Sequence, residues 1–353
     1  MITFYPGPSR INSKIPDYFK DAVLDGVMSL NHRSAEFEKI YADCVQALKE
    51  KLSIPEDYEI LFTSSATECW EIIAQSLIKA NSYHIYNGAF GEKWFNYTKK
   101  IRPAAQGFSF DRQKALDVYE LDIPEETELI AVTQNETSNG TALNNSTIKN
   151  LRERYPDQLI AVDATSSMAG IQLDFADADI WFASVQKCFG LPAGLGIMIC
   201  SPQALKIATG IDEKAHYNSF NFMVENMLRY QTSYTPNVLN IYFLMRVMQD
   251  AKSIVEVEQK LKDRYKDWLN FFARFKSVNL LIKDDRVRSR TVLTLSGPDD
   301  LVKSIKQKAK KAGILIGNGY GDLKDDTFRL ANFPAIKSKE IRLLEELLQN
   351  NLK

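Results

Sequence analysis

Short apolar runs alternate with amphipathic helical patterns across residues 58–200, and this alternation constrains the fold most strongly. The runs at residues 129–133 and 159–162 have the length and composition of strands, and residues 146–155 between them have helical spacing. Strand, helix and strand in this order form right-handed crossovers of a parallel sheet. The sequence therefore predicts an α/β fold with a large, mostly parallel sheet and helices on both of its faces.

Polar or aromatic residues follow the predicted strands. Thr67, Phe90, Thr137, Asp163 and Lys187 each stand soon after such a run. In open parallel sheets, ligands bind in the crevice at the carboxyl ends of the strands. We therefore expect these five side chains to converge on one crevice. The segment at residues 135–140, which contains Thr137, is too polar and turn-rich to belong to the core.

Lys187 lies between two apolar segments, after the run at residues 180–183 and before the glycine-rich residues 190–196. A lysine in such a position is paired or desolvated, and desolvation lowers the pKa of the amine. A neutral amine suits Schiff-base chemistry, so Lys187 is a candidate nucleophile. The alternative is a lysine at a strand end whose amine reaches solvent.

Two further stretches suit a phosphate group and a flat ring. Residues 63–67 form a polar turn before a helical pattern that begins at Cys69, and free N–H groups at a helix start attract phosphate. A turn of this kind is also an ordinary helix cap. Phe90 stands in a predicted loop between Gly88 and Gly91, where its ring can stack on a ligand or pack beneath the loop.

Two arginines are candidates for binding anions. His32 and Arg33 precede Ser34, a predicted cap of a long helix that runs to Leu52, so they form either an anion site or a structural cap. Arg329 lies in a strand-like stretch, and an arginine that points inward from a strand needs an anionic partner. Its alternative is a position on the surface.

The length of 353 residues predicts about two domains. We expect a large domain at residues 15–245 and a small α+β domain at residues 246–353, because helical and strand-like patterns at residues 253–316 start a second unit. Residues 4–9 are rich in proline and cannot be helical, so residues 1–14 are expected to form an extended arm that joins the two.

Composition excludes several classes of partner. The net charge is −1, which gives no basic stripe for nucleic acid. No apolar run approaches the roughly 18 residues of a membrane span. The four cysteines have no metal-ligand spacing and are too few for a disulfide scaffold, which favours a cytoplasmic protein without a metal site. Small molecules are therefore the expected partners.

The order of these features resembles the class V aminotransferases of the fold-type I pyridoxal-phosphate enzymes, over nearly the whole chain. The most specific matches are residues 161–167, AVDATSS, and residues 185–190, VQKCFG. Both are similar to the phosphoserine aminotransferases and to their serine or alanine:glyoxylate relatives. The resemblance implies a large domain that binds pyridoxal 5'-phosphate and a smaller C-terminal domain.

The resemblance also implies a role for each matching residue in holding the cofactor. Lys187 would bind it covalently, and Asp163 would pair with its pyridine nitrogen and keep that nitrogen protonated. Thr137 would hydrogen-bond the phenolic oxygen, and Phe90 would stack on the ring where relatives often have tryptophan. The phosphate would be held by Ser65, Ala66, Thr67 and Gln186, completed by Tyr234 and Thr235 from the second subunit of a homodimer.

For the substrate, the resemblance implies that Arg329 binds the α-carboxylate. The pair His32-Arg33 resembles the pair that holds the substrate phosphate across the dimer in phosphoserine aminotransferases, which favours phosphoserine with 2-oxoglutarate, a reaction of serine biosynthesis. A second His-Arg pair of those enzymes is missing, and only Lys324 in residues 321–326 can substitute. The opening Pro6-Gly7-Pro8-Ser9 is closer to relatives that use glyoxylate, so alanine or serine with glyoxylate or pyruvate is the alternative.

Two other functions fit less well. A cysteine desulfurase of this fold needs a cysteine on a loop of the small domain, and the last cysteine is Cys200. A non-catalytic subunit would not need Lys187, Asp163 and Arg329 together. The sequence therefore predicts a pyridoxal-phosphate-dependent aminotransferase.

Overall fold

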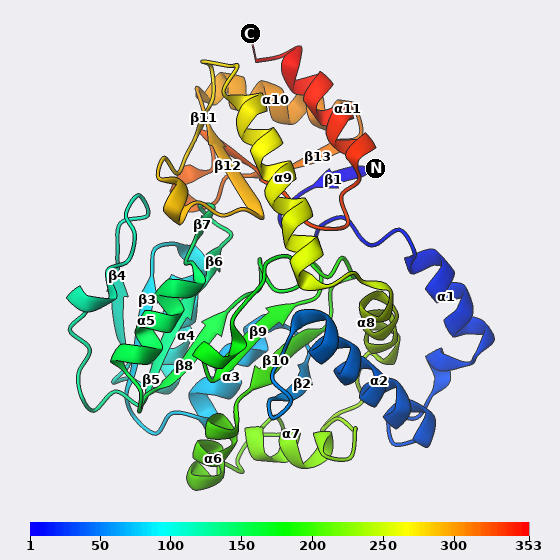
Figure 1. Ribbon diagram of the computed structural model, residues 1–353, viewed down its shortest axis with the longest axis vertical. Helices are drawn as coiled ribbons and strands as arrows, with labels where there is room; N and C mark the ends of the chain where they lie inside the picture. Colours follow the sequence, from blue (N-terminus) through cyan, green and yellow to red (C-terminus); the bar gives the residue numbers. More distant parts are fainter. Residues whose placement is uncertain (353) are drawn as a thin grey trace.

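A seven-stranded sheet forms the centre of the larger part of the molecule (Figure 1). The structure is a computed structural model that describes residues 1–352. The strand order is β2 (Glu59–Thr63), β10 (Gly196–Cys200), β9 (Ile180–Ser184), β8 (Leu159–Asp163), β5 (Leu129–Thr133), β3 (Ser82–Tyr86) and β4 (Gln106–Ser109). All neighbours pair in parallel except β10, which runs antiparallel to both β9 and β2. The predicted α/β class with a mostly parallel sheet is confirmed.

The central strands are buried along their whole length, because both faces of the sheet are covered. Near-continuous apolar sequence, such as Leu-Ile-Ala-Val in β5 and Ile-Trp-Phe-Ala in β9, follows from this burial. The helices of this part are α1 (Ile15–Leu24), α2 (Ala35–Leu52), α3 (Ala66–Ser76), α4 (Ala89–Ile101), α5 (Asn145–Arg154), α6 (Pro202–Ile211), α7 (Phe220–Met227) and α8 (Val238–Asp250).

Helix α2 shows how local sequence sets an element. Ser34 has extended backbone angles and its side chain accepts a hydrogen bond from the Phe37 N–H at 3.3 Å, so the predicted cap and the end at Leu52 are both confirmed. The helix stops where Ser53 adopts the left-handed conformation, with φ of 61°. Its buried face packs against α8.

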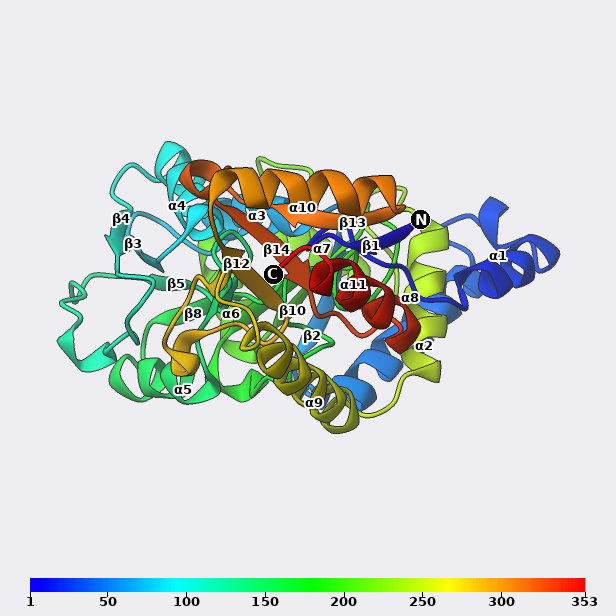
Figure 2. The same ribbon diagram turned by 90° about the horizontal axis from the view of Figure 1, so that it is seen from above.

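A second, mostly antiparallel sheet lies above the first (Figures 1 and 2). Its strand order is β1 (Ile2–Phe4), β13 (Ile314–Asn318), β14 (Thr327–Ala331), β12 (Val292–Ser296) and β11 (Asn279–Leu280). Helices α9 (Ile254–Phe272), α10 (Asp299–Lys311) and α11 (Ser338–Gln349) accompany it. Phe4, Trp268 and Phe328 belong to its own hydrophobic core, which is separate from the core around the large sheet.

The N-terminal segment contacts both parts of the molecule. Strand β1 pairs in parallel with β13 at the edge of the small sheet, and residues 5–8 then pass to the large sheet, where the Ser9 N–H donates to the Gln186 carbonyl at 3.1 Å. Residue 246, the predicted domain boundary, lies within α8, four residues before that helix ends. The division at this residue stays a prediction.

Short elements complete the described chain. The ribbon β6 (Asn135–Glu136) and β7 (Thr141–Ala142) follows β5, and the 3-10 helices are η1 (Val27–Ser29), η2 (Val118–Glu120), η3 (Phe175–Asp177), η4 (Asp285–Val287) and η5 (Gly321–Leu323). Within residues 1–352, every helix is too short or too polar to cross a membrane.

Candidate active site

A cleft of about 470 Å³ lies between the two sheets, at the carboxyl ends of the parallel strands. It brings together most of the side chains that the sequence analysis selected, namely Ala66, Thr67, Phe90, Thr137, Asp163, Gln186, Lys187, Lys324 and Arg329. The expected convergence of strand ends on one crevice is therefore confirmed. Ser65 stands next to this lining, as the cap of α3.

Lys187 lies three residues after β9, and its side chain is 8% exposed. Its Nζ donates to Thr137 Oγ1 and to Ser166 Oγ, each at 2.8 Å. Burial lowers the pKa of the amine to about 8, although the negative charges of Asp163 and Glu136 oppose this shift. At pH 7 roughly a tenth of the amine is then neutral and nucleophilic, far more than for a lysine with an ordinary pKa. Because the side chain is buried, the solvent-exposed alternative is wrong.

Asp163 is the last residue of β8 and is 5% exposed. Burial raises the pKa of its carboxyl group, while contact with Thr165, whose N–H donates to Oδ1 at 2.9 Å, opposes the increase. The carboxylate thus sits at the cleft with little solvent to stabilise its charge. Such a group is suited to pairing with a cationic atom of a bound molecule.

The first turn of α3 faces the cleft through Ala66 and Thr67. Ser65 caps this helix by accepting from the Glu68 N–H at 3.2 Å, and the Ala66 N–H donates to Ser184 Oγ at 2.9 Å. The predicted helix start at Cys69 is three residues too late, because the capping residue is Ser65. The positive end of a helix at the cleft provides a place for an anionic group.

Phe90 lies in the first turn of α4, so its prediction as a loop residue is wrong. The Phe90 and Gly91 N–H groups both donate to Glu136 Oε2 at 3.1 Å, and this buried carboxylate stabilises the helix start. Gly88 precedes the helix because a Cβ there would lie 2.4 Å from Glu136 Cγ. The Phe90 ring centroid is 5.5 Å from Lys187 Nζ.

The polar segment at residues 135–140 is buried, which contradicts the expectation that it lies outside the core. Its side chains satisfy one another: Glu136 Oε1 accepts from the Ser138 N–H at 2.9 Å and from Ser138 Oγ at 2.6 Å. Asn139 Oδ1 accepts from the Thr141 N–H at 3.0 Å. Because these bonds replace bonds to water, polar composition does not keep the segment at the surface.

Arg329 points inward from β14 and is 4% exposed, so the surface alternative is wrong. Its Nε donates to the Asn318 carbonyl and its Nη1 to the Thr137 carbonyl, each at 2.7 Å. Burial lowers the pKa of the guanidinium group. Two bonds fix the orientation of the group while other N–H donors remain available to an anion in the cleft.

Several residues at the cleft were not selected from the sequence. Ser166 hydrogen-bonds both Lys187 and Thr137, and its position three residues after Asp163 was the available signal. The Tyr320 ring lies 5.3 Å from the Phe90 ring, and its hydroxyl accepts from Lys93 Nζ. The contacts of Tyr320 join distant parts of the chain, so no local pattern indicates them.

The N-terminal arm covers Lys187. Residues 5–8 line the cleft, and Gly7 has φ of 137°, a conformation that favours glycine. A Cβ at Gly7 would lie 2.8 Å from Lys187 Cε. The arm therefore lies so close to the lysine that only a glycine fits at this position.

Four selected residues lie outside the cleft of this chain. Arg33 is exposed, and its Nη1 donates to Gln231 Oε1 at 2.8 Å. Burial and the neighbouring Arg33 lower the pKa of His32. Tyr234 packs its ring 6.3 Å from the ring of Tyr217, and Thr235 is exposed. The resemblance predicts that all four act from the second subunit.

Comparisons with known protein families, sequences and structures all point to aminotransferases. Residues 6–320 match the family model described as aminotransferase class-V. The chain is 27% identical to phosphoserine aminotransferase of Corynebacterium glutamicum, over 97% of this chain and 93% of that protein. The crystal structure of a phosphoserine aminotransferase from Cytophaga hutchinsonii is 30% identical, with a TM-score of 0.95 over 100% of this chain and 99% of that one. An alanine–glyoxylate aminotransferase from a Nostoc species, 16% identical with a TM-score of 0.84 over 100% of this chain and 95% of that one, shares the fold.

Proposed function

The chain belongs to the aminotransferase class-V family, and on this premise we propose that it is a pyridoxal-phosphate-dependent aminotransferase that acts on phosphoserine and 2-oxoglutarate. The observation that carries the proposal is the buried Lys187 amine, with its pKa of about 8, in one cleft with Asp163 and Arg329. The relatives named phosphoserine aminotransferase match over nearly their whole length, which supports this choice of substrate.

The residues at the cleft fit pyridoxal phosphate. Lys187 offers an amine that can react with an aldehyde, and Asp163 offers a buried carboxylate for a protonated ring nitrogen. Ser65, Ala66, Thr67 and Gln186 would hold the phosphate, since the α3 N-terminus opens on the cleft there. Phe90 supplies an aromatic face, and Thr137 a hydroxyl.

When bound, pyridoxal phosphate supplies a reactive aldehyde and a ring that accepts an electron pair from the substrate. Lys187 Nζ would hold the cofactor, and its amine is placed to take up the substrate Cα proton and to return it. Thr137 and Ser166 orient that amine, with Nζ–O distances of 2.8 Å. The negative charge of Asp163 would keep the nitrogen of a bound pyridine ring cationic in a site of low dielectric.

Arg329 binds the α-carboxylate of the amino acid or oxo acid. Its planar guanidinium group can donate two parallel hydrogen bonds to a carboxylate, which the ammonium group of a lysine cannot reproduce. The bonds to Asn318 and Thr137 hold that plane in place before substrate arrives. Every amino-acid substrate carries this carboxylate, so Arg329 serves both half-reactions.

The phosphate of phosphoserine requires a second cationic partner. His32 and Arg33 lie outside the cleft of their own chain, and we assign them to the cleft of a second copy, with Tyr234 and Thr235 completing the phosphate site of the cofactor there. This arrangement makes the active protein a homodimer. Large exposed apolar side chains near these residues, including Tyr217 at 65% and Leu228 at 66%, are consistent with a surface that a second copy covers.

The alternative substrates are alanine or serine with glyoxylate. One observation favours them: of residues 321–326, only Lys324 brings a cation to the cleft, and it is exposed. Neither alanine nor serine carries a second anionic group, so neither needs Arg33. A direct comparison of the substrate pairs therefore decides between the two proposals.

We infer a cytoplasmic location for this protein. All four cysteines are buried and free, as expected in a reducing compartment.

The test measures kcat/KM for phosphoserine with 2-oxoglutarate and for alanine or serine with glyoxylate. We expect Arg33→Ala to weaken transition-state binding of phosphoserine by roughly 2 to 5 kcal/mol, because a desolvated phosphate loses its charged partner. Turnover of alanine should barely change, whereas Arg329→Ala should damage both pairs. Arg112→Ala, which removes another exposed arginine, is the matched control. Intact phosphoserine kinetics in Arg33→Ala, or a native preference for glyoxylate, would replace phosphoserine with the alternative.

A further inference from the structure

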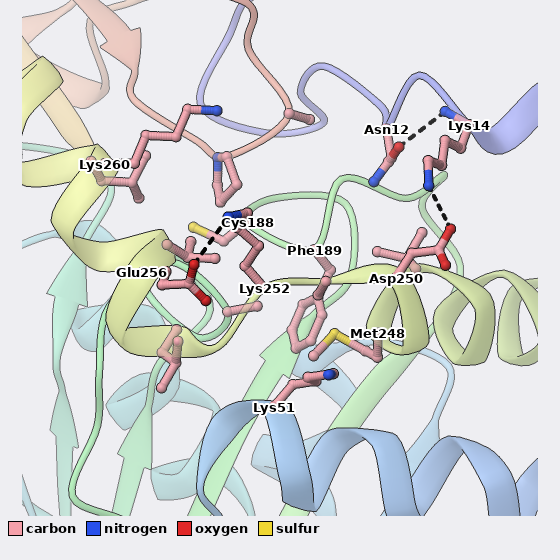
Figure 3. A pocket seen from close by; sticks show the side chains of 18 of the residues that line it. Asn12, Lys14, Lys51, Cys188, Phe189, Met248, Asp250, Lys252, Glu256 and Lys260 are labelled. Carbon is pink, nitrogen blue, oxygen red and sulfur yellow. Dashed lines mark hydrogen bonds and ion pairs between the residues drawn. The ribbon is translucent and has the colours of Figure 1, made fainter.

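A second pocket, of about 370 Å³, lies beside the loop that follows Lys187 (Figure 3). It shares no lining residue with the active-site cleft. Its walls come from Cys188 and Phe189, the end of α8, the first turns of α9, the end of α2, residues 12–14 of the N-terminal segment and residues 334–337 before α11. The pocket thus lies where helices and loops of the large part, the link between α8 and α9, and the loop before α11 meet.

The inner wall of this pocket is apolar. Phe189 and Met248 face its centre in Figure 3, and Ile254, Leu261 and Ile336 extend the wall. These five side chains are almost fully buried within the fold, and the atoms that they present to the pocket are hydrocarbon, sulfur or aromatic carbon. If a purely polar molecule bound here, this apolar wall would remain in contact with water. A ligand with an apolar portion is therefore favoured.

The edge of the pocket is strongly basic, unlike the chain as a whole. Five lysines and two carboxylates line it, a net charge of +3, whereas the full chain carries −1. The lysines are Lys14, Lys51, Lys252, Lys260 and Lys337, and the carboxylates are Asp250 and Glu256. In Figure 3, Lys51 lies next to Met248 and Lys252 reaches toward Glu256 beside Cys188, while Lys260 lies farther along the pocket, beyond Cys188.

Part of this positive charge is unbalanced. Lys14 pairs with Asp250 at 2.8 Å and Lys252 with Glu256 at 3.0 Å, so the two carboxylates of the pocket are already used. Lys51 pairs at 2.9 Å with Glu50, which does not line the pocket. Within residues 1–352, Lys260 and Lys337 form no ion pair. An anion placed here would meet Lys260 and Lys337 without breaking an existing pair, whereas Lys51 and Lys252 would share the anion with the carboxylates that they already contact.

We propose that this pocket binds a small amphipathic anion, with an aliphatic or aromatic body against Phe189 and Met248 and a carboxylate or sulfonate-type group among Lys51, Lys252 and Lys260. The apolar wall removes hydrocarbon from water, and the lysines supply long-range attraction that depends on salt. This site is separate from the aminotransferase chemistry, and its existence does not depend on which amino acid the cleft accepts.

The test uses the protein loaded with pyridoxal phosphate and the fluorescent probe anilinonaphthalene sulfonate, an aromatic body with one anionic group. We expect saturable binding that weakens as salt is added. Octanoate should displace the probe, whereas octanol, which lacks the charge, should displace it poorly. Phosphoserine should leave the bound probe in place because the cleft and the pocket have no common residue.

Charge-reversing variants locate the binding site. Lys260→Glu and Lys51→Glu should each raise the Kd of the probe by about tenfold or more, since each replaces attraction by repulsion. Lys266→Glu makes the same change on the outer part of α9, away from the pocket, and should leave the Kd unchanged. Two variants on different helices guard against a local folding defect in either one, and their melting temperatures are compared with the native protein.

The proposal is overturned if the probe does not bind saturably, if phosphoserine displaces it, or if all three variants bind it as the native protein does. The last result would assign the fluorescence to an apolar surface elsewhere on the molecule.

Discussion

The inner and outer parts of the active-site cleft are built differently. The floor, formed by Lys187, Asp163, Thr137 and Arg329, is buried, and each of these polar groups has at least one hydrogen bond to the protein. The rim, formed by Thr67 and Lys324, is exposed. The floor is thus fixed within one chain, whereas the proposed recognition of the substrate side chain depends on exposed residues and on a second copy.

The difference has a physical origin. A buried charge is costly unless it is paired, so the position and protonation of each floor group are determined by its neighbours. An exposed ammonium group on the rim has no such requirement and contributes little through any single contact. Substitutions should therefore have large effects on the floor and small effects on the rim.

The largest effect is expected for Lys187→Ala. Turnover should fall on the order of 10⁴-fold, because the amine that moves the Cα proton is lost. Some cofactor binding should remain through the α3 N-terminus. Steady-state kinetics and the absorption spectrum of the cofactor measure the two properties. Lys206→Ala, on α6, is the control, and turnover within about tenfold of native in Lys187→Ala would contradict the role of the floor.

Asp163→Asn should reduce turnover by about 10²- to 10³-fold, since the negative charge that faces the ring nitrogen is removed. The stability of the folded protein, in contrast, should not fall. The folded protein raises the pKa of this carboxyl group, so the ionised form costs stability once the pH exceeds its unfolded value, and asparagine avoids that cost. We therefore expect the melting temperature of the cofactor-free protein at neutral pH to stay the same or rise.

The exposed Asp157→Asn controls for the change of net charge. Near-normal turnover of Asp163→Asn would mean that another carboxylate pairs with the cofactor.

Gly7→Ala tests whether the arm belongs to the floor. The added Cβ would lie 2.8 Å from Lys187 Cε, so we expect a ten- to hundredfold loss of kcat, on the order that misplacement of a reacting group costs. Gly26→Ala is a matched control, because Gly26 also has positive φ, 69°, and a Cβ there meets nothing within 4 Å. If both variants lost the same factor in kcat, the loss in Gly7→Ala would come from backbone strain and not from contact with Lys187.

The smallest effect is expected for Lys324→Ala. This exposed lysine should contribute about 0.2 to 1 kcal/mol to phosphoserine binding, which is less than about sixfold in KM. Measurements at low and high salt should show this contribution shrinking as salt is added. A loss above about tenfold at high salt would place Lys324 with the floor and end the distinction between floor and rim.

Much of the fold could be predicted because periodicity and caps are local. Helix α2 starts after Ser34 and ends at Leu52 as predicted, and strand β5 coincides with the run at residues 129–133. The crevice follows from the same information, since strand ends of a parallel sheet meet at one edge. Arg329 is buried, in agreement with the prediction that its side chain points inward from its strand.

The errors arise where distant residues decide local structure. Phe90 is helical because Glu136, distant in sequence, accepts from the first turn of α4. Residues 135–140 are buried because their polar side chains bond to one another. The approach of Gly7 to Lys187 joins the chain start to β9, which no pattern within either segment indicates.

The most direct test of the account is to find the lysine that carries pyridoxal phosphate. Borohydride reduction fixes the cofactor on the amine that binds it, and peptide mapping then identifies the residue. We expect the label on Lys187, within the sequence Val-Gln-Lys-Cys-Phe at residues 185–189. Recovery of the label on any other lysine, or its absence from a protein that is saturated with cofactor, would contradict the assignment of Lys187 and with it the proposed active site.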